Sequence, residues 1–102
     1  MLIRDAIARA GSEHHAYFLV AAYIESLQRR SAHSILPLHL TALPINGLAD
    51  LKRRRDVARS ILAMFLRERD AAYSPMRECY EVFNAAVERI FALRVTASPV
   101  PA

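Results

Sequence analysis

The sequence contains one cysteine, two glycines and no tryptophan among its 102 residues. A single cysteine cannot form an internal disulfide, so nothing indicates a secreted fold held together by disulfides. With only Gly11 and Gly47, the chain cannot build a phosphate-binding glycine loop, a dinucleotide fingerprint or a Gly-x-Ser-x-Gly elbow. These shortages exclude several well-defined enzyme classes. We expect a protein that is not an enzyme and that uses no cofactor.

Long apolar stretches are also missing. The longest uninterrupted apolar run, residues 16–24, has nine residues, which is about half of a membrane span. It follows Glu13-His14-His15 instead of a basic stretch, and no small-residue cleavage site comes after it, so a signal peptide is not indicated. We therefore expect a cytoplasmic protein that makes no contact with the membrane.

What the chain has in quantity is hydrophobic residues, at 54% of the total. Together with the low glycine content, this favours a compact all-α domain. Apolar spacing of three and four residues predicts three long helices, at about 13–30, 47–70 and 75–95, and a short N-terminal helix over 2–10. Ser12 and Ser74 are expected as N-caps, the latter followed by Pro75. We predict a small helical bundle over residues 1–95 and a flexible C-terminal tail over 96–102.

The connection between the first two long helices is unusual because it is both proline-containing and apolar. Pro37 and Pro44 interrupt residues 31–46. The segment also carries six large apolar residues: Ile35, Leu36, Leu38, Leu40, Leu43 and Ile45. A loop of this length and composition does not remain in water. We expect it to run across the bundle with its leucines buried and with one short helical turn near 38–43.

The helix at 13–30 has two apolar faces, whereas the helix at 75–95 has one and is therefore expected to pack on the outside of the bundle. A helix that is apolar on all sides must be covered on more than one side. The second face could be covered by residues 31–46 or by a second copy of the chain, and we favour a homodimer. The predicted interface residues are His15, Phe18, Leu19, Ala22 and Ser26.

The positive charge is concentrated in residues 47–70, which carry seven basic and four acidic side chains. The cations Lys52, Arg53, Arg55 and Arg59 could contact an anionic surface, either an acidic protein partner or a nucleic acid. Nucleic acid is not favoured, because Asp56 lies in the middle of this face and no aromatic residues are interleaved with the cations. The simplest interpretation is a solvated face with internal ion pairs.

Arg54 is different, since it falls on the predicted core face of the same helix. Two partners are considered for Glu25, which lies near apolar residues on the helix at 13–30. The simple one is Arg29, four residues further on. The other is Arg54, which would make a buried ion pair across the bundle.

The remaining reactive side chains do not form a catalytic or metal-binding pattern. His14 and His15 are adjacent, so their rings diverge by about 100° on a helix and cannot share a metal ion. Cys79 falls on or beside the apolar stripe of its helix, as is typical of a buried structural thiol. We therefore predict a non-enzymatic protein-interaction or regulatory module without a metal site. Less favoured alternatives are a nucleic-acid-binding protein and a small-ligand protein with its pocket between residues 31–46 and the first two long helices.

Overall fold

The computed structural model describes residues 1–30, 36–68 and 74–97. Its elements are α1 (Ile3–Ala8), α2 (Glu13–Arg30), α3 (Leu38–Thr41), α4 (Gly47–Glu68) and α5 (Ser74–Ala97). Within those residues every regular element is a helix, which confirms the predicted all-α bundle of three long helices and a short N-terminal one. The last helix ends two residues later than predicted, and Thr96 Oγ1 donates a hydrogen bond of 2.6 Å to the carbonyl of Ala92. The rest of the predicted tail, residues 98–102, lies outside the described residues.

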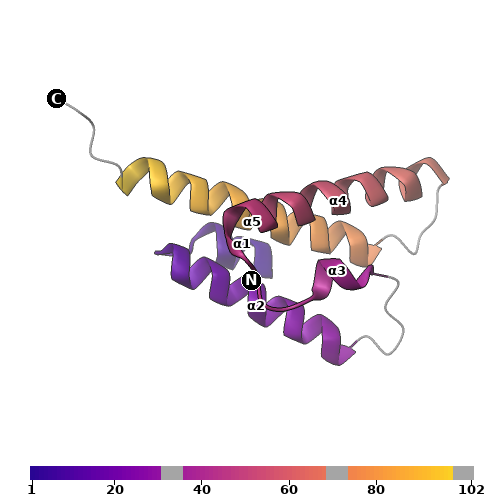
Figure 1. Cartoon of the computed structure of the whole chain (residues 1–102), viewed down its shortest axis with the longest axis horizontal. Helices are drawn as coiled ribbons and strands as arrows, with labels where there is room; N and C mark the ends of the chain where they lie inside the picture. Colours follow the sequence, from indigo (N-terminus) through magenta and orange to yellow (C-terminus); the bar gives the residue numbers. More distant parts are fainter. Residues whose placement is uncertain (31–35, 69–73, 98–102) are drawn as a thin grey trace.

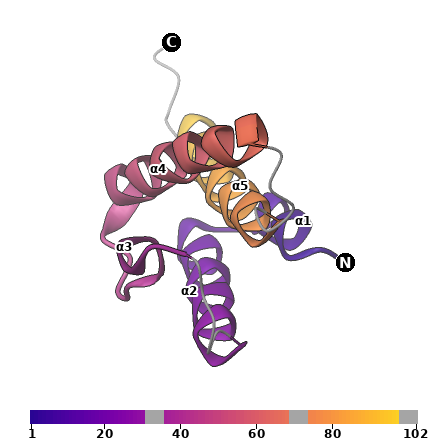
Figure 2. The same ribbon diagram turned by 90° about the vertical axis from the view of Figure 1, so that its right-hand side faces the viewer.

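The centre of the bundle is α5, which contacts α4 on one side and α1 and α2 on the other (Figure 1). Seen along the bundle, α4 lies above α5 and α2 lies below it, while α3 bridges α2 and α4 at the side (Figure 2). The one-sided pattern of residues 75–95 favoured a position on the outside of the bundle, and the structure corrects this. The buried side of α5 is wide enough to contact several neighbouring helices. Its buried residues are Met76, Cys79, Val82, Phe83, Ala86, Val87 and Ile90.

Three polar contacts join α5 to the N-terminal part of the chain. Arg4 Nη1 lies 2.7 Å from Glu81 Oε2, and Arg89 Nε donates a 2.7 Å hydrogen bond to the carbonyl of Ala10. Arg94 pairs with Glu13 at 3.0 Å at the start of α2. These contacts fix how α1 and α2 lie along α5, while the apolar residues between them supply most of the stabilisation.

The start of α2 follows its predicted signal. The Ser12 side chain accepts a 3.1 Å hydrogen bond from the backbone N–H of His15, the usual N-cap arrangement, which satisfies an otherwise unpaired helix donor. From there α2 buries one side against the rest of the bundle: Ala16, Val20, Tyr23, Ile24 and Leu27. In the described part of the chain, four residues of the nine-residue apolar run are buried, four are half-buried and one, Phe18, is exposed.

Residues 36–46, here called the strap, cross from α2 to α4 as the sequence predicted. Leu36 and Leu40 are buried and α3 forms the expected single turn. Leu43, which was also expected to be buried, is 38% exposed. Gln28 Nε2 on α2 donates a 2.6 Å hydrogen bond to the carbonyl of Thr41. This contact falls near the end of α2, so the strap lies against the C-terminal end of that helix. Residues 31–35 of the predicted connection lie outside the described residues.

A buried guanidinium holds the other side of the strap. The Arg54 side chain on α4 donates to the carbonyls of Leu40 at 3.2 Å, Ala42 at 2.8 Å and Pro44 at 3.4 Å. Arg54 is only 4% exposed. An irregular segment has few backbone partners of its own, and buried carbonyls must be satisfied. Arg54 therefore takes the place of a regular hydrogen-bond ladder for the strap.

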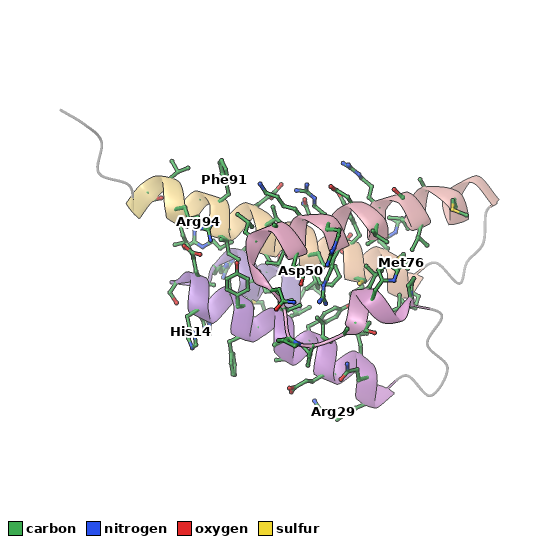
Figure 3. All side chains as sticks on the ribbon, in the orientation of Figure 1. His14, Arg29, Asp50, Met76, Phe91 and Arg94 are labelled. Atoms are coloured by element: carbon green, nitrogen blue, oxygen red, sulfur yellow. The ribbon has the colours of Figure 1, made fainter. Side chains whose placement is uncertain are left out.

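The carboxylate of Asp50, which lies one turn before Arg54 on α4 and is labelled in Figure 3, balances the positive charge of the Arg54 guanidinium. Arg54 Nη2 lies 3.0 Å from Asp50 Oδ2, and Asp50 also accepts bonds from the Asn46 N–H at 2.9 Å and from Arg53 at 2.8 Å. Asp50 is 5% exposed. The two charges and their hydrogen bonds form a closed cluster, which is the condition under which a buried ion pair is tolerated.

The structure corrects the predicted pairing of Glu25 with Arg54. Arg54 is buried on the core face as predicted, but its carboxylate partner is Asp50. Glu25 is exposed on α2, and among the described side chains neither Arg54 nor Arg29 pairs with it. Asp50 has the advantage of lying on the same helix at i−4, so its pairing needs no contact across the bundle.

We predict that Arg54→Met destabilises the protein by about 3–5 kcal/mol, because it leaves the buried carboxylate of Asp50 without its buried counter-ion and the strap carbonyls without their donor. Urea unfolding followed by circular dichroism measures this. Lys52→Met is the matched control, since Lys52 is exposed on the same helix, and it should change stability by less than about 0.5 kcal/mol. A change below about 1 kcal/mol for Arg54→Met would contradict the role given to this cluster.

The cluster also predicts a pH dependence. Burial acts to raise the pKa of Asp50, but the Asn46 N–H and the guanidinium groups of Arg54 and Arg53 outweigh it and hold the pKa below its ordinary value of 3.8. A carboxyl whose pKa is lowered by folding stabilises the folded state above the ordinary value, and this contribution is lost as the pH falls through the lowered pKa. Urea midpoints between pH 7 and pH 2 should therefore fall less steeply in Asp50→Asn than in the wild-type protein.

Candidate functional site

The side of α2 that faces away from the bundle carries the most conspicuous apolar residue of the helix. Phe18 is 61% exposed. It lies in a row with His14, Ala22, Glu25 and Arg29, which we call the outer face of α2. His14 and Arg29 mark the two ends of this face on the lower side of the molecule (Figure 3). An aromatic ring in the middle of such a face is typical of a contact surface.

His15 supports the ring of Phe18 from the neighbouring position on the helix. The two ring centroids lie 6.3 Å apart and the ring planes differ by 11°. This offset stacking, between residues three apart, restricts the Phe18 side chain before any partner arrives. A partly ordered anchor loses less entropy on binding than a free one.

The predicted interface residues are not equally available. His15 and Phe18 are exposed, whereas Leu19, Ala22 and Ser26 are half-buried, with Leu19 packed against the core. Beside them is an open hollow of about 340 Å³ lined by Ile3, Ala22, Tyr23, Ser26 and Glu78. The described part of the chain therefore leaves the second face of α2 partly uncovered, at Phe18 and at the hollow beside Ala22 and Ser26.

The predicted basic face of α4 is divided by its acidic residues. Arg55 lies 3.0 Å from Asp56 and Arg59 lies 3.5 Å from the same carboxylate. Arg53 pairs with Asp50 at 2.8 Å. Lys52 is exposed, and no described carboxylate pairs with it. A phosphate backbone would have to compete with these internal pairs for three of the four cations, so the arrangement favours the ion-paired interpretation over nucleic-acid contact.

A second apolar row lies along one flank of α4, and the sequence did not single it out. Val57, Ile61 and Met64, here called the α4 patch, follow one another at i, i+4 and i+7. Met64 is 56% exposed, while Val57 and Ile61 are half-buried. An open hollow of about 560 Å³ beside them is lined by Arg53, Asp56, Val57, Ser60 and Ile61.

Cys79 is unsuited to nucleophilic chemistry. It is fully buried on α5. Burial among apolar groups, with a smaller effect of Glu78, raises the pKa of its thiol to about 12. Since the thiolate is the reactive form, the environment of Cys79 suppresses its reactivity.

Other hollows lie along the junction of α1 with α5. They are lined by charged side chains that include Arg4 and Glu81, whose ion pair ties the two helices together. Among the described residues, no three His, Cys, Asp or Glu side chains gather in a way that could hold a metal ion. The predicted small-ligand pocket falls partly on residues 31–35, outside the described residues.

The comparisons with known proteins add no relatives. Searches against family models, curated proteins and solved structures give no match for this chain. In the described parts of the chain, no helix has the length and apolar character needed to span a bilayer. Any statement on function therefore depends on the surfaces described above.

We predict that Cys79 reacts slowly with iodoacetamide in the folded protein. With a pKa of about 12, roughly one thiol in ten thousand is ionised at pH 8. Alkylation followed by mass spectrometry should be at least about 100-fold slower in buffer than in 8 M urea. Comparable rates in both conditions would show that the α5 core opens readily.

Proposed function

We propose that this protein is a non-enzymatic interaction module that acts as a homodimer through the outer face of α2. The observation that carries the proposal is the exposure of Phe18 in the middle of a helix whose opposite side forms part of the core. The strap, which could have covered this face, lies near the end of α2 instead. A second copy of α2 presents the same exposed ring of Phe18 and the same small side chain of Ala22, so the two helices can pack against each other.

An antiparallel pair of α2 helices fits these features best. With the twofold axis at the level of Val20, position 18 of one copy lies opposite position 22 of the other. The small side chain of Ala22 then leaves room for the ring of Phe18, and this contact occurs twice. The same register places the His14–His15 end of one helix beside Glu25 and Ser26 of the other.

The expected affinity follows from the size of the contact. An α-helix of 18 residues is about 27 Å long, so one helix from each copy gives an interface at the small end of the range for specific complexes. We therefore expect a dissociation constant of about micromolar order.

Phe18→Ser should weaken the dimer about 100-fold, because burial of a Phe side chain is worth about 1.5–3 kcal/mol and each dimer loses two, both already partly covered in the monomer. Sedimentation velocity over a concentration series measures the change. Phe91→Ser is the matched control: Phe91 is 56% exposed on α5 and points away from α2 on the other side of the molecule (Figure 3). Unfolding curves of both variants report whether the fold is retained.

A charge exchange tests the register. His14→Glu brings two carboxylates together across the contact and Glu25→Arg removes the favourable pairing, so each variant alone should weaken the dimer several-fold. The double variant should return to within about threefold of the wild-type value, since the reversed pair is again complementary. A wild-type protein that is monomeric at several hundred micromolar would overturn the proposal. Dimerisation that is unaffected by Phe18→Ser would place the interface elsewhere.

A further inference from the structure

One side chain of α4 holds three backbone carbonyls of the strap. The guanidinium of Arg54 donates to the carbonyls of Leu40, Ala42 and Pro44 at distances between 2.8 and 3.4 Å. These carbonyls lie close together in the chain, within residues 40–44, and they share one donor group. They are therefore held together or released together.

The strap adds little apolar surface to the core. Among its side chains that the structure describes, the buried hydrophobic ones are Leu36 and Leu40, Ile45 is half-buried, and Ala42 and Leu43 are exposed. The long helix α5, by comparison, buries a whole side of hydrophobic residues. Segments with few buried apolar contacts open at a lower free energy than the core of the same protein. The strap is therefore the element most easily released from the bundle.

The long helices do not need the strap in order to stay together. The helices α1, α2 and α4 each contact α5 directly. Figure 2 shows α3, the helical turn of the strap, at the side of this arrangement between α2 and α4. Release of the strap therefore leaves the contacts of α1, α2 and α4 with α5 in place.

The thiol of Cys79 lies near the point where Arg54 holds the strap. Cys79 is fully buried on α5, and the positive charge of Arg54 acts on its thiol, so the two side chains are close neighbours in the core. Arg54 in turn contacts the strap carbonyls. Removal of the strap therefore opens a route for water and small reagents to this part of α5.

We infer that the strap is a lid over the junction of α2 and α4, held closed by Arg54, and that it opens as a unit while α1, α2, α4 and α5 stay folded. Opening exposes Leu36 and Leu40 together with the apolar residues that they cover. The inference goes beyond the proposed dimer and does not depend on it, because Arg54, Gln28 and the strap are not part of the contact around Phe18.

Alkylation of Cys79 by iodoacetamide measures the opening in the wild-type chain. The rate is followed by mass spectrometry at urea concentrations below the unfolding transition, and global unfolding is followed by circular dichroism in the same buffer. The response of an opening reaction to urea scales with the surface that it exposes. Because the lid exposes much less surface than the whole chain, the logarithm of the alkylation rate should rise with urea at less than about half of the slope for global unfolding.

Variants separate lid opening from other routes to Cys79. Arg54→Met should raise the alkylation rate at least about 30-fold with the helix content retained, because the strap carbonyls lose their donor. Ile7→Ala is the matched control, since it removes a fully buried side chain of α1 and lowers global stability without touching the strap. The two variants are compared at urea concentrations that give them equal free energies of global unfolding, where Ile7→Ala should react at least about tenfold more slowly.

A milder pair of variants covers the case in which Arg54→Met does not fold. Gln28→Ala removes only the bond from α2 to the strap carbonyl of Thr41 and should raise the alkylation rate about threefold. Lys52→Met changes a side chain that is exposed on α4 and should leave the rate unchanged.

Three results would overturn the inference. The first is an equal urea slope for alkylation and for global unfolding, because Cys79 would then be reached only when the whole chain unfolds. The second is an equal alkylation rate in Arg54→Met and Ile7→Ala at matched global stability. The third is a shallow urea slope with a rate that neither Arg54→Met nor Gln28→Ala alters, which would assign the access to local opening at the start of α5.

Discussion

The buried guanidinium of Arg54 is the interaction on which the rest of the structure depends. It satisfies strap carbonyls from Leu40, Ala42 and Pro44 and is balanced by Asp50 one turn earlier on α4. Without such a donor, an irregular segment could not lie against the bundle, because each unsatisfied buried carbonyl would cost about 1–3 kcal/mol. With it, Leu36 and Leu40 are held in the core.

The position of the strap then decides which surfaces remain open. Arg54 fixes it on α4 and Gln28 fixes it near the end of α2, so it covers the region between these two helices. The N-terminal half of α2 lies beyond its reach, and Phe18 remains exposed there. On α4, Val57 and Ile61 remain half-buried and Met64 exposed. The exposure of Phe18 is thus a consequence of where this one short segment lies.

Sequence patterns were reliable for local structure and weak for contacts between elements. The helix spans, the N-cap at Ser12 and the single turn within the strap all follow from residue spacing and local chemistry. The inward position of Arg54 was also visible, since periodicity gives the direction of a side chain around its own helix. Periodicity does not say which neighbour lies in that direction. Glu25 was therefore considered as a partner for Arg54, and α5 was expected outside a bundle of which it is the centre.

The basic residues of α4, Lys52 to Arg55 and Arg59, are neighbours in sequence but make different contacts. Arg54 points inward and serves the strap, Arg53 divides its interactions between Asp50 and the hollow, and Arg55 and Arg59 share Asp56. Ion pairing leaves the net charge of this surface unchanged, but the paired cations are held in direction by their acidic neighbours and are less available to a ligand. A ligand that offers only charge gains little over these existing pairs.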